Sequence, residues 1–381
     1  MILLSTLAKW SPPALFRRSD LECGGLPDAG YLPFRCRIYE RAVADRIPLT
    51  GSIEITSRCN LGCVHCYISN TGETKQDLSL IELESIIDQL AEEGCLWLLI
   101  TGGEPLLRPD FRDFYTYVKR CGIIPILFTN GTLITEDIAD LLESMPPYLV
   151  EVSIYGSTED TFEAITRVPG SFRQCMDGID RLRSRGIRLH LKTMAMSLNV
   201  DEIPAMKSLS EELGVPFRFD TMLNCTLGGD GGPLDYRLSP ERTISLDKQD
   251  MSRMGVWHDL VESYPDQVQY PDRIFQCGAG LCTFHIDCTG HLSVCMMYRE
   301  KSFDLRKGTF SDGWRLYLPD VIAGEWSRDV ACSTCTLKSM CGQCPGWGYL
   351  EHGDSEEPVE YLCKVAHMRA EMLDLPGASA R

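Results

Sequence analysis

Short apolar runs alternate with amphipathic stretches along the middle of the chain, from about residue 53 to about residue 221. Apolar runs of about four to eight residues are typical of strands, and longer segments with apolar residues every third or fourth position are typical of helices. The pattern predicts strands at residues 53–56, 97–101, 124–129, 149–154, 188–194 and 217–221. It predicts helices between them at residues 78–93, 111–121, 136–144, 171–185 and 201–213. Such alternation builds βαβ units and a parallel sheet, so we expect an α/β fold, a partial (β/α)6 barrel of the TIM type.

Three further segments flank this barrel, which is expected to span residues 51–225. Residues 1–50 contain several prolines and no sustained periodicity, and they are expected to form an irregular lead-in. Residues 226–270 open with a glycine-rich run and continue as a helical bridge over about 240–264, which indicates a linker. Residues 271–381 are dense in cysteine and are expected to form a separate C-terminal domain.

The net charge and the cysteine content limit the classes of function that the chain can have. The net charge of −17 argues against a nucleic acid as the main partner, because that binding rests on clustered Lys and Arg. No run of about 18 apolar residues occurs, so no transmembrane helix is expected, and the apolar N-terminus lacks the basic leader of a signal peptide. The 18 cysteines therefore indicate metal ligation in a reducing cytoplasm rather than disulfides.

Three cysteines, Cys59, Cys63 and Cys66, follow the first predicted strand with the spacing Cys-x3-Cys-x2-Cys. One tight loop can therefore present three thiolates to one metal cluster. A [4Fe–4S] cluster takes four cysteine ligands when it is closed, so three leave one iron open for a substrate or cofactor. Zinc is the alternative, with His65 as a fourth ligand, although structural zinc usually takes Cys and His in pairs. The spacing favours a catalytic iron–sulfur cluster.

Together with the run Thr101-Gly102-Gly103-Glu104-Pro105 after the second strand, this loop resembles the radical S-adenosylmethionine (SAM) superfamily. The resemblance implies that the open iron chelates SAM. It also implies that an electron from the cluster cleaves SAM to methionine and a 5′-deoxyadenosyl radical, which makes the three cysteines the catalytic residues. Gly102, Gly103 and Glu104 would contact the amino group of SAM, because glycines allow close backbone approach and a carboxylate can receive an ammonium group. A simple turn is the alternative for this run.

Other positions match SAM-binding residues of the superfamily. Ser153, on the fourth strand, would hydrogen-bond the ribose or methionyl part. Lys192, on the fifth strand, would lie near the SAM carboxylate, with an ion-paired or surface Lys as the alternative. Tyr67 could pack near the adenine or against the barrel wall. Tyr155 stands where many relatives have an aspartate, so a carboxylate that could contact substrate is missing.

Three more residues could act on a substrate. Asn130 ends the third strand and could line the cavity. Asp230, in the glycine-rich run, could be a general base or could form a turn. Cys225, at the end of the sixth strand, could donate a hydrogen atom, whereas the other isolated cysteines are expected to pack in the core.

A second group of cysteines begins at Cys277 and is large enough for two fully ligated clusters. It resembles the SPASM extension of radical SAM peptide-modifying enzymes, which holds two auxiliary [4Fe–4S] clusters. By this resemblance the first auxiliary cluster would bind Cys277, Cys282, Cys295 and Cys344. The second would bind Cys332, Cys335, Cys341 and Cys363.

Two departures from the SPASM pattern leave alternatives open. Cys341 and Cys344 are separated by two residues where the family commonly has three. Cys288 is surplus and could replace Cys282, and without Cys282 the first auxiliary cluster would keep an open iron for a substrate thiol or amide. A zinc ribbon is the alternative for residues 332–344.

We therefore expect a radical SAM oxidoreductase that abstracts a hydrogen atom from a ribosomally made peptide and installs a crosslink, an epimer or an oxidised residue. Its cofactors would be SAM and three [4Fe–4S] clusters, one binding SAM and two auxiliary. Its partners would be a precursor peptide, a reductant such as flavodoxin or ferredoxin, and a separate peptide-recognition protein. The alternatives are formylglycine formation on a protein, as in sulfatase maturation, radical modification of a small metabolite, and a non-enzymatic iron–sulfur electron-transfer protein.

Overall fold

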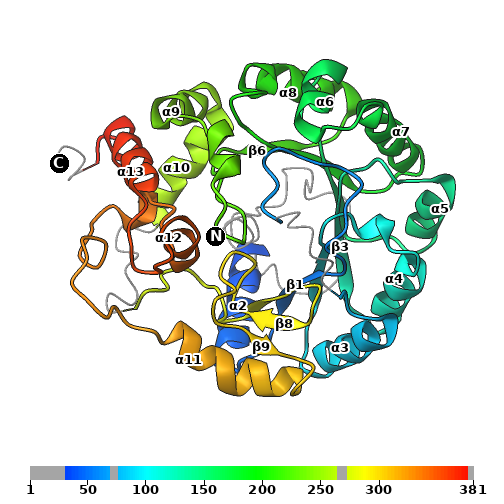
Figure 1. Cartoon of the computed structure of the whole chain (residues 1–381), viewed down its shortest axis with the longest axis horizontal. Coiled ribbons are helices and arrows are strands. Elements are labelled where there is room, and N and C mark those ends of the chain that lie inside the picture. The colour runs from blue at the N-terminus through cyan, green and yellow to red at the C-terminus, as the bar shows by residue number, and fades with distance from the viewer. Residues whose placement is uncertain (1–30, 69–75, 264–272, 376–381) are drawn as a thin grey trace.

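The computed structural model describes residues 31–68, 76–263 and 273–375. Its centre is one sheet with the strand order β6-β5-β4-β3-β2-β1-β7-β8-β9. Strands β1 to β6 are parallel and adjacent in chain order, and helices surround them on the outside (Figure 1). They are β1 (Thr50–Glu54), β2 (Trp97–Thr101), β3 (Ile124–Thr129), β4 (Leu149–Ser153), β5 (Leu189–Met194) and β6 (Phe217–Asp220). The six parallel strands confirm the partial barrel that the sequence predicts.

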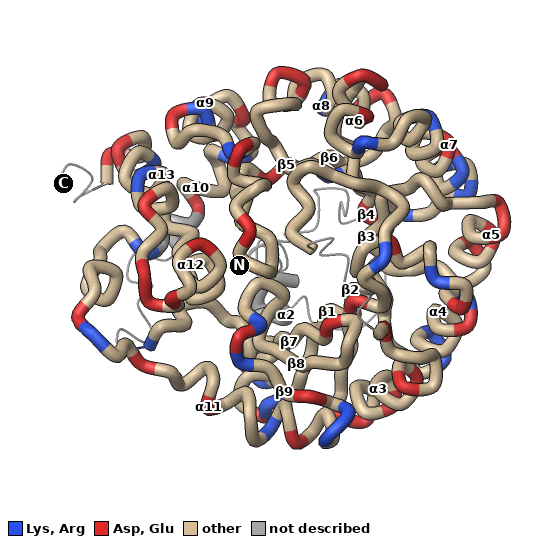
Figure 2. The backbone as a smooth tube through the Cα atoms, viewed as in Figure 1, with Lys and Arg blue, Asp and Glu red and all other residues tan. Residues whose placement is uncertain are grey.

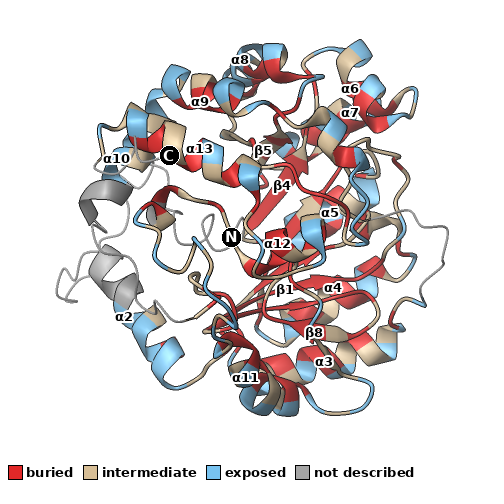
Figure 3. Ribbon diagram, turned by 60° about the vertical axis from the view of Figure 1, so that its left-hand side comes forward, coloured by how far each residue is buried: buried red, intermediate tan, exposed pale blue. Residues whose placement is uncertain are grey.

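Amphipathic helices cover the outer face of this sheet. They are α3 (Leu80–Glu92), α4 (Phe111–Arg120), α5 (Glu136–Ser144), α6 (Glu159–Thr166), α7 (Ser171–Ser184) and α8 (Ile203–Leu213). In α3, for example, Leu83, Ile87 and Leu90 lie on one face at helical spacing and are fully buried. The strands and the inward helix faces are buried while the outer helix faces are exposed (Figure 3), and most charged residues lie on those outer faces (Figure 2). No helix in the described part of the chain is long and apolar enough to span a bilayer.

Alternation along the strands separates the core from the barrel interior. Val150 and Val152 of β4 belong to the main hydrophobic core beneath the helices. Glu151, between them, is buried on the opposite face and pairs with side chains of β5 and β6. The barrel interior is therefore polar and charged at several strand positions.

The C-terminal part of the chain continues the same sheet. β7 (Thr283–Ile286) pairs in parallel with β1, and β8 (His291–Ser293) and β9 (Phe303–Asp304) add an antiparallel hairpin. Helices α9 (Pro240–Gln249) and α10 (Met251–Ser263) form the expected bridge, and α11 (Leu318–Ile322), α12 (Pro345–His352) and α13 (Glu360–Met372) follow the hairpin. α13 packs on α9, away from α4 and α5 (Figure 1). The cysteine-rich segment is thus joined to the barrel edge by backbone hydrogen bonds.

In the described part of the lead-in and the barrel, two α-helices were not predicted from the sequence, and neither were α11, α12 and α13 of the C-terminal part. α2 (Tyr31–Ala44) lies in the expected irregular lead-in, where apolar residues do not gather on one helical face. α6 is only eight residues long, and it is capped by Thr158, whose hydroxyl accepts from the backbone N–H of Thr161. Short or weakly amphipathic helices leave little periodic signal, because their stability comes from caps and tertiary packing.

Candidate functional site

The Cys59–Cys66 loop follows the carboxyl end of β1 and is fastened to α6. The Gly62 N–H donates to Thr166 O (2.9 Å), and the Val64 N–H donates to Ile165 O (3.0 Å). These bonds satisfy carbonyls at the end of α6 and hold the loop in shape. The sequence placed this loop correctly, whereas its dependence on α6 came only from the structure.

The three thiols of this loop lie close enough to influence one another. Burial raises the pKa of Cys59 to about 11, and the negative charges of Glu104 and Cys66 add to the effect. Burial, then the neighbouring thiols, also raises the pKa of Cys63. Three thiolates would not be stable here without a compensating cation. A metal cluster supplies that charge, because metal ligation deprotonates thiols, so the residues fit the cluster that the spacing predicts.

Gly102 and Gly103 let the second strand end pack directly on the cysteine loop. A Cβ at Gly103 would lie 2.3 Å from the carbonyl oxygen of Arg58, and one at Gly102 would lie 2.3 Å from that of Thr56. Gly102 also has φ +139°, a backbone conformation that favours glycine. The Gly103 N–H donates to Thr56 O (2.9 Å), and the Glu104 N–H donates to Arg58 O (2.9 Å). In this structure the glycines serve the contact between two loops.

Glu104 is fully buried and joins the ends of β2 and β3. Its carboxylate accepts from the Thr129 hydroxyl (2.8 Å), the Asn130 N–H (2.7 Å) and the Leu106 N–H (3.1 Å). Burial raises the pKa of Glu104 to about 7, while these donors act to lower it. Asn130 in turn approaches the cysteine loop, because its Nδ2 lies 3.8 Å from Cys59 Sγ and 3.0 Å from Asn60 Oδ1.

Lys192 lies inside the barrel in a group of charged residues. Its Nζ is 3.6 Å from Glu151 Oε2 and 2.9 Å from the ring centroid of Phe128. Arg218 of β6 also binds Glu151, through Nε (3.0 Å) and Nη2 (2.5 Å). Burial lowers the pKa of Lys192 to about 7, although Glu151 opposes the shift. Lys192 is thus ion-paired, and its side chain is 17% exposed.

Tyr155 does not stand free at the end of β4. Its ring packs edge-on against His65 of the cysteine loop, with centroids 4.7 Å apart, and also contacts Phe162 of α6. Its hydroxyl interacts with the Ser153 side chain, which lies at the end of β4. The residue that replaces the aspartate of relatives therefore supports the loop from behind.

Tyr67 belongs to a buried group that the sequence did not reveal. Glu54, at the end of β1, accepts from Arg299 Nη1 (2.9 Å) and Nη2 (2.6 Å), and Arg299 Nε donates to Met296 O (2.8 Å). Burial and the charge of Glu54 raise the pKa of Tyr67. His285 of β7 lies 3.7 Å from Glu54. Glu54 interrupts an apolar run at residues 53–55. This feature of the sequence could have predicted the group, because a buried carboxylate needs a cationic partner.

The C-terminal cysteines divide into two groups in space. Burial, and then the charges of Cys332, Cys335 and Cys363, raise the pKa of Cys341. Burial, and then the charges of Cys295 and Cys277, raise the pKa of Cys344. The charge that acts on Cys282 is that of Arg46 instead, and Cys282 packs with Ala42 and Leu49.

The cysteines whose side chains the structure describes are free thiols. No group of three or more His, Cys, Asp or Glu side chains in the described ranges is arranged to hold a single metal ion. In a [4Fe–4S] cluster each cysteine binds a different iron, so its ligands stand further apart than those of one ion. Asp230 accepts from the Gly232 N–H (2.8 Å), as in a turn, and is exposed.

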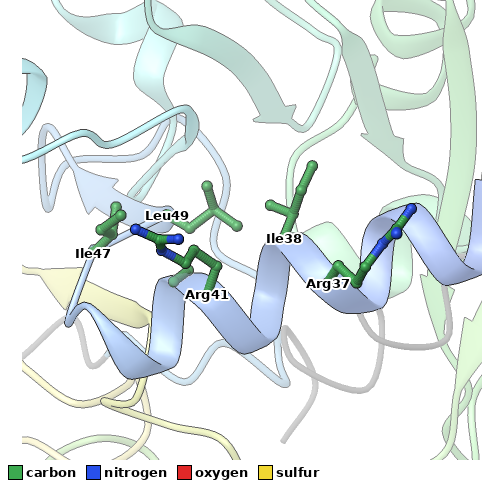
Figure 4. A pocket seen from close by; sticks show the side chains of 6 residues that line it. Arg37, Ile38, Arg41, Ile47 and Leu49 are labelled. Atoms are coloured by element: carbon green, nitrogen blue, oxygen red, sulfur yellow. The ribbon is translucent and has the colours of Figure 1, made fainter.

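A separate hollow of about 550 Å³ lies at the other end of the barrel (Figure 4). It is lined by Arg37, Ile38, Arg41, Ala42, Ile47 and Leu49. Leu49 precedes the amino end of β1, whereas the cysteine loop follows its carboxyl end. This hollow therefore lies apart from the thiols of the cysteine loop.

The chain is similar to known proteins in sequence and in fold. Residues 53–209 match the family model described as the radical SAM superfamily. The chain is 27% identical over 335 residues to an AdoMet-dependent heme synthase of Methanosarcina barkeri, covering 80% of this chain and 94% of that protein. It is 27% identical over 323 residues to the mycofactocin maturase MftC of Mycobacterium tuberculosis, covering 80% and 79% of the two chains. The structure of Streptococcus suis SuiB bound to precursor peptide SuiA has a similar fold, with a TM-score of 0.65, 16% identity, and coverage of 93% of this chain and 85% of that one.

Proposed function

Because this chain belongs to the radical SAM superfamily, we propose that it abstracts a hydrogen atom from a ribosomally made peptide and installs a crosslink, an epimer or an oxidised residue. The observation that carries the proposal is the convergence of three partly buried thiols at the carboxyl end of β1, with the Gly102–Glu104 run packed against their loop. In barrels of this kind the chemistry lies at the carboxyl ends of the strands.

The family implies a [4Fe–4S] cluster and SAM, which together supply a 5′-deoxyadenosyl radical. Cys59, Cys63 and Cys66 would hold the cluster and leave one iron for SAM. Asn130, whose amide lies 3.8 Å from Cys59 Sγ, would stabilise that thiolate, since hydrogen bonds to ligand sulfur adjust the reduction potential. Lys192 would offer positive charge to the SAM carboxylate.

Other residues would shape the cavity around SAM. Glu104 would fix the ends of β2 and β3 through its three accepted hydrogen bonds. Ser153 would hydrogen-bond SAM from the end of β4. Tyr67 would close one wall, between Glu54 and the cysteine loop.

The C-terminal cysteines would hold two auxiliary clusters that accept the leftover electron or hold the substrate. Cys277, Cys295 and Cys344 would serve the first, and the set 332, 335, 341 and 363 would serve the second. The similarity to the maturase MftC supports a peptide substrate. The precursor peptide, a flavodoxin or ferredoxin as reductant, and a separate peptide-recognition protein would be its partners in a reducing cytoplasm.

A small metabolite is the second candidate substrate. The similarity to an AdoMet-dependent heme synthase covers 94% of that protein, so an iron-containing tetrapyrrole with carboxylate side chains is the specific candidate. The chemistry at the three-cysteine loop would be the same, and only the occupant of the barrel interior would differ.

SAM cleavage by the anaerobically reconstituted chain tests the shared chemistry. We expect 5′-deoxyadenosine from the wild type with SAM and dithionite, and none from Cys59→Ala/Cys63→Ala/Cys66→Ala. Cys121→Ala is the matched control, because Cys121 directs its thiol to Asp88 of α3 on the helical layer (3.7 Å) and should not affect cleavage. A wild type that carries iron and sulfide but cleaves no SAM would contradict the proposal.

Deuterium transfer separates the two substrates. A perdeuterated candidate peptide, encoded beside the gene, should pass deuterium into 5′-deoxyadenosine, and the peptide should change mass. Transfer from a deuterated tetrapyrrole and not from peptide would replace the peptide proposal with the metabolite one.

A further inference from the structure

We propose that Cys225 supplies the fourth thiolate of the first auxiliary cluster, the position that the SPASM resemblance assigns to Cys282. This inference rests on the auxiliary clusters of the proposed function. Its chemistry is ligand binding without oxidation: the Cys225 thiol loses its proton to solvent, and the thiolate sulfur bonds to the iron that the other three cysteines leave open.

The first auxiliary site is one ligand short in the structure. Cys277, Cys295 and Cys344 make up the proposed set, and a Cβ at Gly346, two residues after Cys344, would lie 2.9 Å from the carbonyl oxygen of Met297, two residues after Cys295. The second set, by contrast, already has four members around Cys341. A closed [4Fe–4S] cluster takes four cysteines, so the first set has room for one more.

Cys282 lies where it cannot easily complete this set. It directly precedes β7, which is parallel to β1, so it lies at the amino ends of the strands. Its carbonyl accepts from the Thr50 N–H (3.1 Å), and its side chain is buried with Ala42 and Leu49, beside Arg46. This thiol therefore already has apolar partners and a neighbouring cation, none of which belongs to the first set.

Cys225 packs close to a cysteine of the first set. With Met297 and Leu350 it forms a small buried cluster, and Cys295 packs against this cluster. Met297 is two residues after Cys295, and Leu350 is on α12, which Cys344 precedes. Cys225 is thus enclosed by segments that follow two of the three cysteines of the first set.

The segment that carries Cys225 is fixed at both ends. The Leu227 N–H donates to Tyr67 O (2.8 Å), next to Cys66. Arg237 pairs with Glu351 of α12 and donates through Nε to Leu223 O (2.7 Å). A side chain on so short a tether has few positions, so ligation by Cys225 would cost little conformational entropy.

An orphaned amide beside Cys225 points to the same group. Asn224 is 6% exposed, and its Nδ2 has no hydrogen-bond partner among the described residues, while its Oδ1 accepts from the Cys225 N–H (2.8 Å). A buried donor without an acceptor is costly. Cluster sulfur is a suitable acceptor, because iron–sulfur centres commonly receive hydrogen bonds at their sulfurs.

The test compares Cys225→Ala with Cys282→Ala in the full chain, reconstituted anaerobically. A wild type with three clusters holds about twelve irons. We expect Cys225→Ala to lose up to one third of this iron, or to lose a single iron on mild oxidation and give a new EPR signal from a three-iron cluster. Cys282→Ala should match the wild type in iron content and EPR.

Cys225→Ser covers the case in which the alanine variant does not fold. A serine oxygen can bind iron, so this variant should keep its iron and shift the EPR spectrum and reduction potential of one auxiliary cluster. Wild-type spectra in both Cys225 variants, iron loss in Cys282→Ala, or a wild type with only about four irons would each overturn the inference. Absence of SAM cleavage in the wild type would instead contradict the proposed function.

Discussion

Individual residues determine how the cysteine loop is packed against its neighbours. Gly103 allows the Glu104 backbone to reach Arg58, and Tyr155 fills the space behind His65 that a shorter aspartate would leave open. Both residues act through packing with the loop. A residue that departs from the pattern of relatives can therefore keep the site intact by serving its support.

Gly103→Ala tests whether the close contact between the two loops is needed to support the site. The added methyl would meet Arg58 O at 2.3 Å, and such overpacking costs about 1–3 kcal/mol. We expect a lower melting temperature and reduced iron loading. Gly255→Ala, where an added Cβ meets no atom within 4 Å, is the control and should load iron as the wild type does. Equal loading by both variants would show that the contact between the loops is dispensable.

At the scale of elements, buried ion pairs join neighbouring strands across the barrel interior. Glu151 of β4 is 2% exposed and binds cations from β5 and β6. Burial acts to raise the pKa of Glu151, but Lys192 and Arg218 lower it overall, so the carboxylate is charged at neutral pH. The three strands therefore share one charge network as well as backbone hydrogen bonds.

Glu151→Gln should destabilise the barrel by about 2–3 kcal/mol. This is less than the roughly 3–5 kcal/mol of a fully buried broken pair, because Lys192 and Arg218 keep 17% and 30% exposure. Chemical denaturation measures the effect. The control is Glu136→Gln, which breaks an exposed pair with Arg185 and should cost about 1 kcal/mol or less. Equal effects of the two variants would refute the role given to the interior network.

The start of α3 makes a pH-dependent contribution. Glu82 forms a capping box with Ser79 and pairs with Arg306 (2.8 Å), and the pKa of Glu82 is lowered to about 2 by Arg306 first and Ser79 next. Stability from this charge is complete above the unfolded value of about 4.3 and is lost as pH falls toward 2. Glu82→Gln should therefore lower the melting temperature at pH 7, and the difference should shrink below about pH 4. Glu212→Gln, an exposed residue of α8, should show no such change; a constant difference for Glu82→Gln across pH would contradict the linkage.

At the scale of the whole molecule, the barrel and the C-terminal part form one structural unit. β7 pairs with β1, and Arg46 after α2 donates to Gly280 O (2.6 Å) and Trp314 O (2.8 Å). Trp314 Nε1 donates back to Arg46 O (2.6 Å), and the guanidinium lies 4.3 Å from its ring centroid. Separation of the two parts would expose these groups together.

We therefore expect one cooperative unfolding transition for the apo chain. Secondary structure followed by circular dichroism and tertiary structure followed by tryptophan fluorescence should change at the same urea concentration. Arg46→Ala should weaken this coupling, while Arg41→Ala, in an exposed pair on α2, should leave it intact. Two separate transitions in the wild type would show that the sheet across β1 and β7 is not a cooperative link.

The sequence by itself determined the partial barrel and the three-cysteine loop. Alternating apolar runs report which faces of each element are buried, and the spacing within residues 59–66 is local, so neither needs knowledge of distant contacts. The strands of the barrel were placed to within about three residues of their structural bounds, the usual error of boundary assignment. The roles of Ser153, Lys192 and the C-terminal cysteines stay predictions.

Only the tertiary structure decided which distant residues meet. The pairing of β7 with β1, the contact of Glu54 with Arg299 and the packing of Cys282 against Ala42 and Leu49 bring together residues that are distant in sequence. The physical reason is that periodicity describes a face of an element but not its partner. Partners are chosen by the packing of the whole chain, where a shift of one residue in a strand turns a side chain to the opposite face.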